Sequence, residues 1–274
     1  MEAFEGKKDI FNGIIVNVQD QKCKSESGFS DRLQYSLQEW KEQGIRGVWL
    51  NIAIECSIYI AKAVKHGFVF HHAQKDYVMM IKWLPTNEPN QLPGYTTHYV
   101  GVAGFVVNEL NQVLLVKERF HKKAKWKLPG GMADPGEDLG VTAKREVFEE
   151  TGIDSEFISL VSFRHQHGFR FGQSDLYFIC EMKALSSEIS VCKHEITDCI
   201  WMDVDEYVAL PDISAANRQF AQDYINQNQR GRSFKIKPRR VLSHDHTKYH
   251  LLYSIKECNN SEEPLLNYDQ NNEI

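Results

Sequence analysis

The order of apolar and polar residues divides the first third of the chain into short strands and helices. Apolar residues at helical spacing, after a Ser-Asp pair and before Gly44, predict a helix over 30–44. A second helix is expected over 55–67. β-rich runs predict four strands, at 10–18, 46–52, 68–73 and 77–84. Together they predict a small α/β domain over 1–88, and the proline-rich stretch 85–95 predicts a boundary after it.

From His98 onward the pattern is mostly that of strands. Two β-rich runs flank the turn ELNQ and predict a hairpin. Further strands and one last helix are expected at 156–167, 174–185, 199–204 and 214–228. We therefore predict a second domain over 95–228. The remainder, 229–274, holds a basic run at 230–240, an alternating apolar run near 249–255 and an acidic tail that we expect to be disordered.

Composition narrows the class of protein without identifying it. The net charge is −5 (32 Lys and Arg against 37 Asp and Glu), so attraction of the whole molecule to nucleic acid or acidic membrane is not expected. The six cysteines are scattered and contain no CxxC pair, which argues for a reducing compartment and against a structural zinc site. No membrane-length apolar run and no signal peptide are recognisable. We expect a cytoplasmic protein, with the nucleus and mitochondrion as open alternatives.

Three glutamates close together in a predicted helix are the strongest chemical signal. Glu146 and Glu150 are four residues apart and share one helix face, with Glu149 beside them. Carboxylate oxygens in this number suit Mg²⁺ or Mn²⁺. The tight turn before the helix would add a backbone carbonyl, that of Gly130. Arg145 is expected to pair with Glu137 and fix the loop against the helix. The alternative is a solvated acidic face held by ion pairs.

The whole pattern around these glutamates resembles the signature of the Nudix hydrolases. Every specified position of that signature is filled, at Gly131, Glu137, Arg145, Glu146, Val147, Glu149, Glu150, Gly152 and Ile153. The resemblance implies an α/β/α sandwich and Mg²⁺-dependent cleavage of a nucleoside diphosphate linked to another group. It also implies that Glu146, Glu149 and Glu150 bind the metal.

The resemblance reaches beyond the signature, from about residue 10 to about residue 225. Segments such as WKLPGG, SFRHQH and FGQSDLYFIC are similar to a Nudix branch with an antisense-fibroblast-growth-factor protein of vertebrates and ADP-ribose/NADH pyrophosphatases of plants. The GVW strand and the HHA strand match that branch's N-terminal extension. ADP-ribose or NADH is therefore the expected substrate. Capped RNA and a low-turnover binding role remain alternatives, and edge strands in the N-terminal domain favour a homodimer.

The sequence offers several candidates for the general base and for the substrate contacts. Glu195, on a loop before the WMDV strand, is the candidate base, and Glu188 is its rival. The other option is a glutamate of the Nudix signature at 131–153, which we call the box, such as Glu146. Arg145 completes the predicted catalytic group. Candidate substrate contacts are basic, aromatic or acidic residues in the strands around the box, namely Lys117, Arg119, Lys127, Arg164, His167, Phe171 and Asp175. Phenylalanines in such strands are more often core residues than stacking platforms.

Two further features of the sequence are considered as possible binding sites. The basic run 230–240 is interpreted as an RNA contact, a nuclear address or a solvated connector. Adjacent His71 and His72 would face opposite sides of a regular strand, so we expect no chelating pair there.

Overall fold

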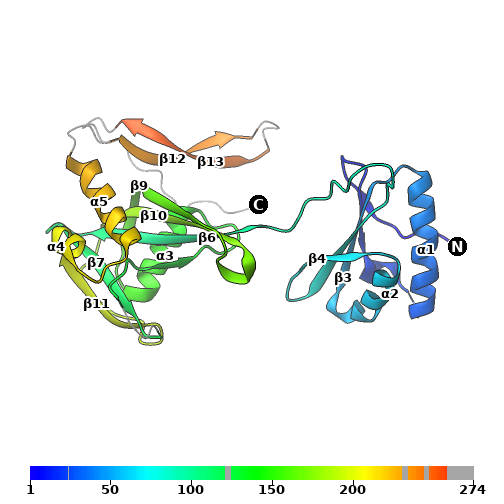
Figure 1. Cartoon of the computed structure of the whole chain (residues 1–274), viewed down its shortest axis with the longest axis horizontal. Helices are drawn as coiled ribbons and strands as arrows, with labels where there is room; N and C mark the ends of the chain where they lie inside the picture. The colour runs from blue at the N-terminus through cyan, green and yellow to red at the C-terminus, as the bar shows by residue number, and fades with distance from the viewer. Residues whose placement is uncertain (24, 121–124, 230–233, 244–246, 258–274) are drawn as a thin grey trace. The chain divides into compact units, whose positions relative to one another are not determined.

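A computed structural model describes the chain except for residues 24, 121–124, 230–233, 244–246 and 258–274. Two compact units make up the molecule, an N-terminal unit of residues 1–97 and a C-terminal unit of residues 98–274 (Figure 1). The division lies just after the proline-rich stretch at 85–95.

The N-terminal unit is a five-stranded sheet with helices on one face. The sheet has the order β1-β2-β3-β5-β4, with β1 Lys7–Lys8, β2 Ile14–Asn17, β3 Gly47–Ala53, β4 Val69–Ala73 and β5 Tyr77–Trp83. Its helices are η1 Val18–Gln21, α1 Glu26–Glu42, η2 Ile54–Tyr59 and α2 Ile60–Lys65. Leu33 and Trp40 of α1 are buried in one core cluster with Leu50 and Ile52 of β3. The antiparallel pairing of β4 with β5 confirms the two neighbouring strands predicted there.

Two helices of this unit differ from the prediction. Helix α1 begins at Glu26, earlier than expected, because the Ser25 hydroxyl accepts a hydrogen bond from the Gly28 amide (3.1 Å) and caps the helix there. The helix predicted over 55–67 begins instead as the 3₁₀ helix η2 and becomes α-helical only from Ile60.

The C-terminal unit is built on a mixed sheet of eight strands. The order is β11-β7-β6-β10-β9-β12-β13, and the short β8 also pairs with β6. The bounds are β6 His98–Val107, β7 Gln112–Glu118, β8 Gly130–Met132, β9 Ser155–Gln166, β10 Ser174–Ala184, β11 Ile196–Asp203, β12 Phe234–Leu242 and β13 Tyr249–Glu257. Strands β6 and β10 run parallel, and β6 and β7 form the predicted hairpin. The helices are α3 Leu139–Thr151, η3 Arg170–Gly172, α4 Val204–Ala209 and α5 Ala215–Gln229.

Helices cover both faces of this sheet, which makes the predicted α/β/α sandwich. Neighbouring residues of β6 alternate between two core clusters, since Val102 packs with Val147 of α3, whereas Ala103 packs with Phe220 of α5. Helix α3 approaches β6 closely at Gly104, where a Cβ atom would lie 2.5 Å from a methyl group of Val147. We call these two sides the α3 face and the α5 face.

Strands β12 and β13 come from the segment 229–274 and form a hairpin that extends the sheet at β9. The acidic tail for which disorder was predicted lies outside the described residues. No helix in the described part is long and apolar enough to cross a membrane. The five cysteines that the structure describes are all free thiols.

Candidate metal and nucleotide site

Two glycines bring the backbone of β8 against the glutamate helix. At Gly130 (φ 154°) a Cβ atom would lie 2.2 Å from the carbonyl oxygen of Val102, so only glycine fits this approach to β6. At Gly131 a Cβ atom would lie 2.5 to 2.6 Å from the carboxylate atoms of Glu146. The missing side chain of Gly131 is therefore the space that the Glu146 carboxylate occupies.

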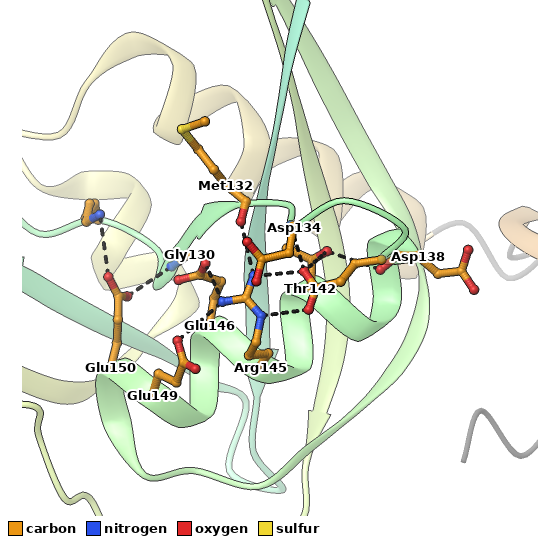
Figure 2. Close-up of polar contacts among 11 residues, drawn as sticks. Gly130, Met132, Asp134, Asp138, Thr142, Arg145, Glu146, Glu149 and Glu150 are labelled. Carbon is orange, nitrogen blue, oxygen red and sulfur yellow. Dashed lines mark hydrogen bonds and ion pairs between the residues drawn. The ribbon is translucent and has the colours of Figure 1, made fainter. Parts of the chain in front are cut away.

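Arg145 connects the loop before α3 to the acidic face of that helix. Its guanidinium donates to both carboxylate oxygens of Glu137 (2.7 and 2.8 Å) and to the carbonyl oxygen of Met132 (3.1 Å). One terminal nitrogen also donates to Glu146 (2.8 Å) and Glu149 (3.3 Å), and Figure 2 shows the guanidinium lying among these groups. The predicted pairing of Arg145 with Glu137 is confirmed. These hydrogen bonds lower the pKa of Glu137 to about 2.

Two carboxyl groups on the same side of α3, those of Glu150 and Glu146, are removed from solvent to different extents. The Glu150 side chain is buried, and its carboxylate accepts a hydrogen bond from the Gly130 amide (3.0 Å), while the Lys127 ammonium lies 4.0 Å away. Burial raises the pKa of Glu150 to about 7. Burial also raises the pKa of Glu146, with Glu149 and Glu195 adding to the effect and Arg145 opposing it. Carboxylates in such surroundings are stabilised by a nearby cation.

The donor set fits a hard divalent cation, although its side chains are not gathered around one point. Within the described residues, no group of three or more His, Cys, Asp or Glu side chains is arranged to hold a metal ion. Arg145 accounts for this, because it holds the carboxylates of Glu146 and Glu149. The Glu149 side chain is 59% exposed, so it has room to turn. Oxygen donors from Glu146, Glu149 and Glu150 match the preference of Mg²⁺ or Mn²⁺, and with the Gly130 carbonyl they stay the predicted ligands.

The loop that carries Glu195 is bound to the end of β7. The Arg119 amide donates to the carbonyl oxygen of Glu195 (2.8 Å), and the Arg119 guanidinium donates to the carbonyl oxygen of Lys193. Arg119, predicted to contact phosphate, thus holds this loop in place. Glu195 lies near enough to Glu146 to raise its pKa, whereas Glu188 is not among the groups that perturb the box carboxylates.

Lys127 and Lys117, both predicted to contact the substrate, lie in different parts of the C-terminal unit. Lys127 joins the box, because its ammonium pairs with Glu118 (2.5 Å) beside Glu150. Lys117 instead lies over the ring of Trp126 (4.0 Å), which packs on the α5 face. Sequence reasoning missed Glu118 and Trp126, although Glu118 directly follows a residue that was selected.

On the α5 face, Arg164 and Asp175 meet across β9 and β10. The Arg164 guanidinium donates to the buried carboxylate of Asp175 (2.8 Å) and lies over the ring of Tyr177 (5.1 Å). Tyr177 packs against the backbone of Gly101, where a Cβ atom would be 2.7 Å from its ring. Burial raises the pKa of Tyr177. Tyr177 was also missed, although its position two residues after Asp175 places both on one face of the strand.

His167 and Phe171 lie in the turn between those strands. His167 shares a hydrogen bond with the Ser174 hydroxyl (2.8 Å), and its ring contacts His165. Phe171 is 94% exposed and has a left-handed backbone (φ 52°), so it is a surface residue and the core alternative is wrong for it. An exposed ring in such a turn is available to a ligand.

The expectation that His71 and His72 face opposite sides of a strand was wrong. A β-bulge interrupts the pairing of β4 between Phe70 and His72, so the regular alternation of side chains ends there. The two Nδ1 atoms lie 2.7 Å apart, and the ring of Tyr95 stacks on His72. This cluster belongs to the N-terminal unit.

Comparisons with known proteins agree with the geometry of the C-terminal unit. The family model described as "NUDIX domain" matches residues 97–224, and the model described as "Nudix hydrolase domain" matches residues 4–84. The chain belongs to the Nudix hydrolase family.

Its relatives bear names from the same family. Nudix hydrolase 2 of Arabidopsis thaliana is 42% identical over 220 residues, which are 79% of this chain and 75% of that protein. Nudix hydrolase 8 of Arabidopsis thaliana is 40% identical over 208 residues (75% and 56%). Human nucleoside diphosphate-linked moiety X motif 6 is 44% identical over 208 residues (74% and 66%). The chain thus spans less than two thirds of the length of the last two proteins.

Among solved structures, the NUDIX domain of Shewanella oneidensis NrtR, in a cocrystal with ADP ribose, is similar at a TM-score of 0.42 and 16% identity. That match covers 49% of this chain and 90% of the other.

Proposed function

We propose that the protein is a Mg²⁺- or Mn²⁺-dependent pyrophosphatase that hydrolyses a nucleoside diphosphate linked to another moiety, with ADP-ribose or NADH as the preferred substrate. The observation that supports this most directly is the buried carboxylate of Glu150 and the partly buried carboxylate of Glu146 beside the Gly130-Gly131 backbone. The name of the human relative, nucleoside diphosphate-linked moiety X motif 6, supports the same substrate class.

In this proposal, Glu146, Glu149 and Glu150 hold the cations together with the Gly130 carbonyl. The bound cations would neutralise the pyrophosphate and lower the pKa of the attacking water. Arg145 fixes Glu146 and ties α3 to the loop through Glu137. Lys127 adds positive charge for the phosphates next to Glu150.

We assign the general base to Glu195. Its loop is fixed by Arg119, and its charge acts on Glu146. The Glu195 carboxylate would take a proton from the attacking water as the water oxygen bonds to one phosphorus. The P–O bond to the bridging oxygen of the pyrophosphate then breaks, so ADP-ribose and water give AMP and ribose 5-phosphate.

Recognition of the remaining groups is proposed for the α5 face and the adjoining turn. Trp126 and Tyr177 offer aromatic rings with Lys117 and Arg164 above them. Rings and cations in this arrangement suit a nucleobase joined to phosphate. His167, Phe171 and Asp175 complete this part of the proposed substrate site.

We also propose a homodimer through the N-terminal unit. Strand β4 is an edge of its sheet and exposes Val69 (59%) and Phe70 (62%). Phe70→Lys should shift the mass measured by light scattering from dimer to monomer; an unchanged mass removes this edge as the interface.

The substrate is tested by hydrolysis of a panel with Mg²⁺ or Mn²⁺. ADP-ribose, NADH, diadenosine polyphosphates, coenzyme A and NAD-capped RNA are compared by product chromatography. The proposal expects AMP from ADP-ribose or NADH at the highest kcat/KM, and absence of turnover on every nucleotide overturns it. Capped RNA is the second candidate, because the basic strand β12 lies in the same unit as the box.

A further inference from the structure

The β12–β13 hairpin is built into the sheet of the C-terminal unit. Ile236 pairs with Leu160 of β9, and both Ile236 and Tyr253 pack against the core cluster on the α3 face. Lys235 forms an ion pair with Glu181 of β10, and the two side chains are only 13% and 11% exposed. A nearly buried ion pair requires a fixed geometry. The hairpin is therefore a defined surface at the edge of the sheet (Figure 1).

The two faces of this hairpin have different chemistry. Residues opposite each other in an antiparallel pair share a face, and successive residues alternate. One face carries cationic and polar side chains over most of its length, and we call it the basic face: Lys235, Lys237, Arg239, Val241, His250, Leu252, Ser254 and Lys256. Most of the exposed apolar residues lie on the other face, namely Leu242 (44%), Tyr249 (65%) and Ile255 (69%), while Leu252 (42%) lies on the basic face.

The middle of the basic face carries two cationic side chains, Lys237 and Arg239, that do not anchor the hairpin. Within the described part of the chain, Lys237 and Arg239 take part in none of the ion pairs, in contrast to the anchoring Lys235. Alternate residues of one strand are about 7 Å apart. This spacing is comparable to the distance between successive phosphates of an extended single-stranded nucleic acid. Cations at this spacing can therefore follow a phosphodiester backbone.

The hairpin also lies beside the signature loop. Arg240, on the opposite face from Arg239, is close enough to Asp138 for its charge to lower the carboxyl pKa that burial raises. Asp138 is the residue immediately before α3, the helix that carries the box carboxylates. The end of β12 that carries Arg240 and Arg239 thus lies near the start of α3, with Arg240 directed to the α3 face and the basic face on the other side of the strand.

We propose that the basic face of the β12–β13 hairpin binds the phosphodiester backbone of a single-stranded RNA whose 5′ end enters the box site. The inference rests on the proposed pyrophosphatase function only for cleavage of that end; binding of the strand is a separate property. An acidic membrane suits the hairpin less well, because insertion needs basic and apolar side chains on one face, and here they are largely separated.

The test measures binding of a short fluorescein-labelled single-stranded RNA without a cap by fluorescence anisotropy at several salt concentrations. The variant Lys237→Gln/Arg239→Gln removes two charges from the basic face. Its matched control, Lys41→Gln/Lys65→Gln, removes two exposed charges from the N-terminal unit and gives the same net charge. ADP-ribose hydrolysis by each protein is measured in parallel and reports an intact box.

The hairpin variant should bind RNA at least tenfold more weakly, and the slope of log K against log salt should fall by about 1.4, or 0.7 for each lost contact. ADP-ribose hydrolysis should be unchanged. The inference is overturned if both variants lose RNA affinity equally or if the unaltered protein binds no RNA. Binding to phosphatidylserine vesicles is measured in parallel, and a hairpin variant that loses vesicle binding but keeps RNA binding also overturns it. If the unaltered protein binds RNA but hydrolyses no nucleotide, the proposed function fails and the RNA surface stands.

Discussion

Replacement of Gly131 by alanine should disturb the proposed metal site and leave the fold in place. Gly131 does not have a positive φ angle, so its backbone accepts alanine. The new Cβ would lie 2.5 Å from a Glu146 oxygen, whereas ordinary contacts begin at 3.4 Å. The carboxylate must therefore move by about 1 Å, and a misplacement of that size costs roughly 100-fold in rate. We expect kcat to fall by about that factor, together with a weaker dependence on Mg²⁺.

The effect on stability should be small by comparison. At most, the displaced carboxylate loses its hydrogen bond from Arg145, which is worth about 1.5 to 3 kcal/mol for a charged pair. The matched control is Gly94→Ala, since a Cβ atom there meets nothing within 4 Å. Circular dichroism checks folding, and steady-state hydrolysis of ADP-ribose with Mg²⁺ varied checks activity. A folded Gly131→Ala enzyme with unchanged kcat and Mg²⁺ dependence would refute the reasoning.

Three further perturbations follow from the contacts. Glu195→Gln should lower kcat strongly with metal affinity kept, and Glu188→Gln should stay active; the reverse result moves the base to Glu188. Because Arg145 lowers the pKa of Glu137 to about 2, the stability from this pair is present above pH 4.5 and lost as the pH falls toward 2. Unfolding curves of Arg145→Gln should lack that acid dependence. Burial lowers the pKa of His72 below 6.5, so its contribution to stability is present above that pH and lost below it; NMR titration showing a pKa above 6.5 contradicts this.

The contacts within the box were predictable from the sequence because its parts are close together in the chain. Helical spacing alone places Glu146 and Glu150 on one face, and the pairing of Arg145 with Glu137 spans only eight residues. The strands followed from apolar periodicity, which reports on burial directly, whereas the α/β/α layers were expected from the resemblance to the Nudix hydrolases.

Contacts between distant parts of the chain were not readable in the same way. Arg119 was selected for phosphate, but its guanidinium holds the carbonyl oxygen of Lys193, 74 residues away. Trp126 and Tyr177 meet their cations only through the pairing of strands. A β-bulge cancels the alternation that was assumed for His71 and His72, and bulges leave no marker in residue type there.

Binding of Mn²⁺ followed by electron paramagnetic resonance tests the central claim most directly, because it observes the cation without requiring a substrate. The unaltered protein should bind Mn²⁺ saturably, and Glu146→Gln/Glu150→Gln should lose that binding while staying folded. The control Glu39→Gln/Glu42→Gln, which removes two glutamates from α1, should bind like the unaltered protein. Mn²⁺ binding that survives in Glu146→Gln/Glu150→Gln, or that is absent from the unaltered protein, would contradict the account.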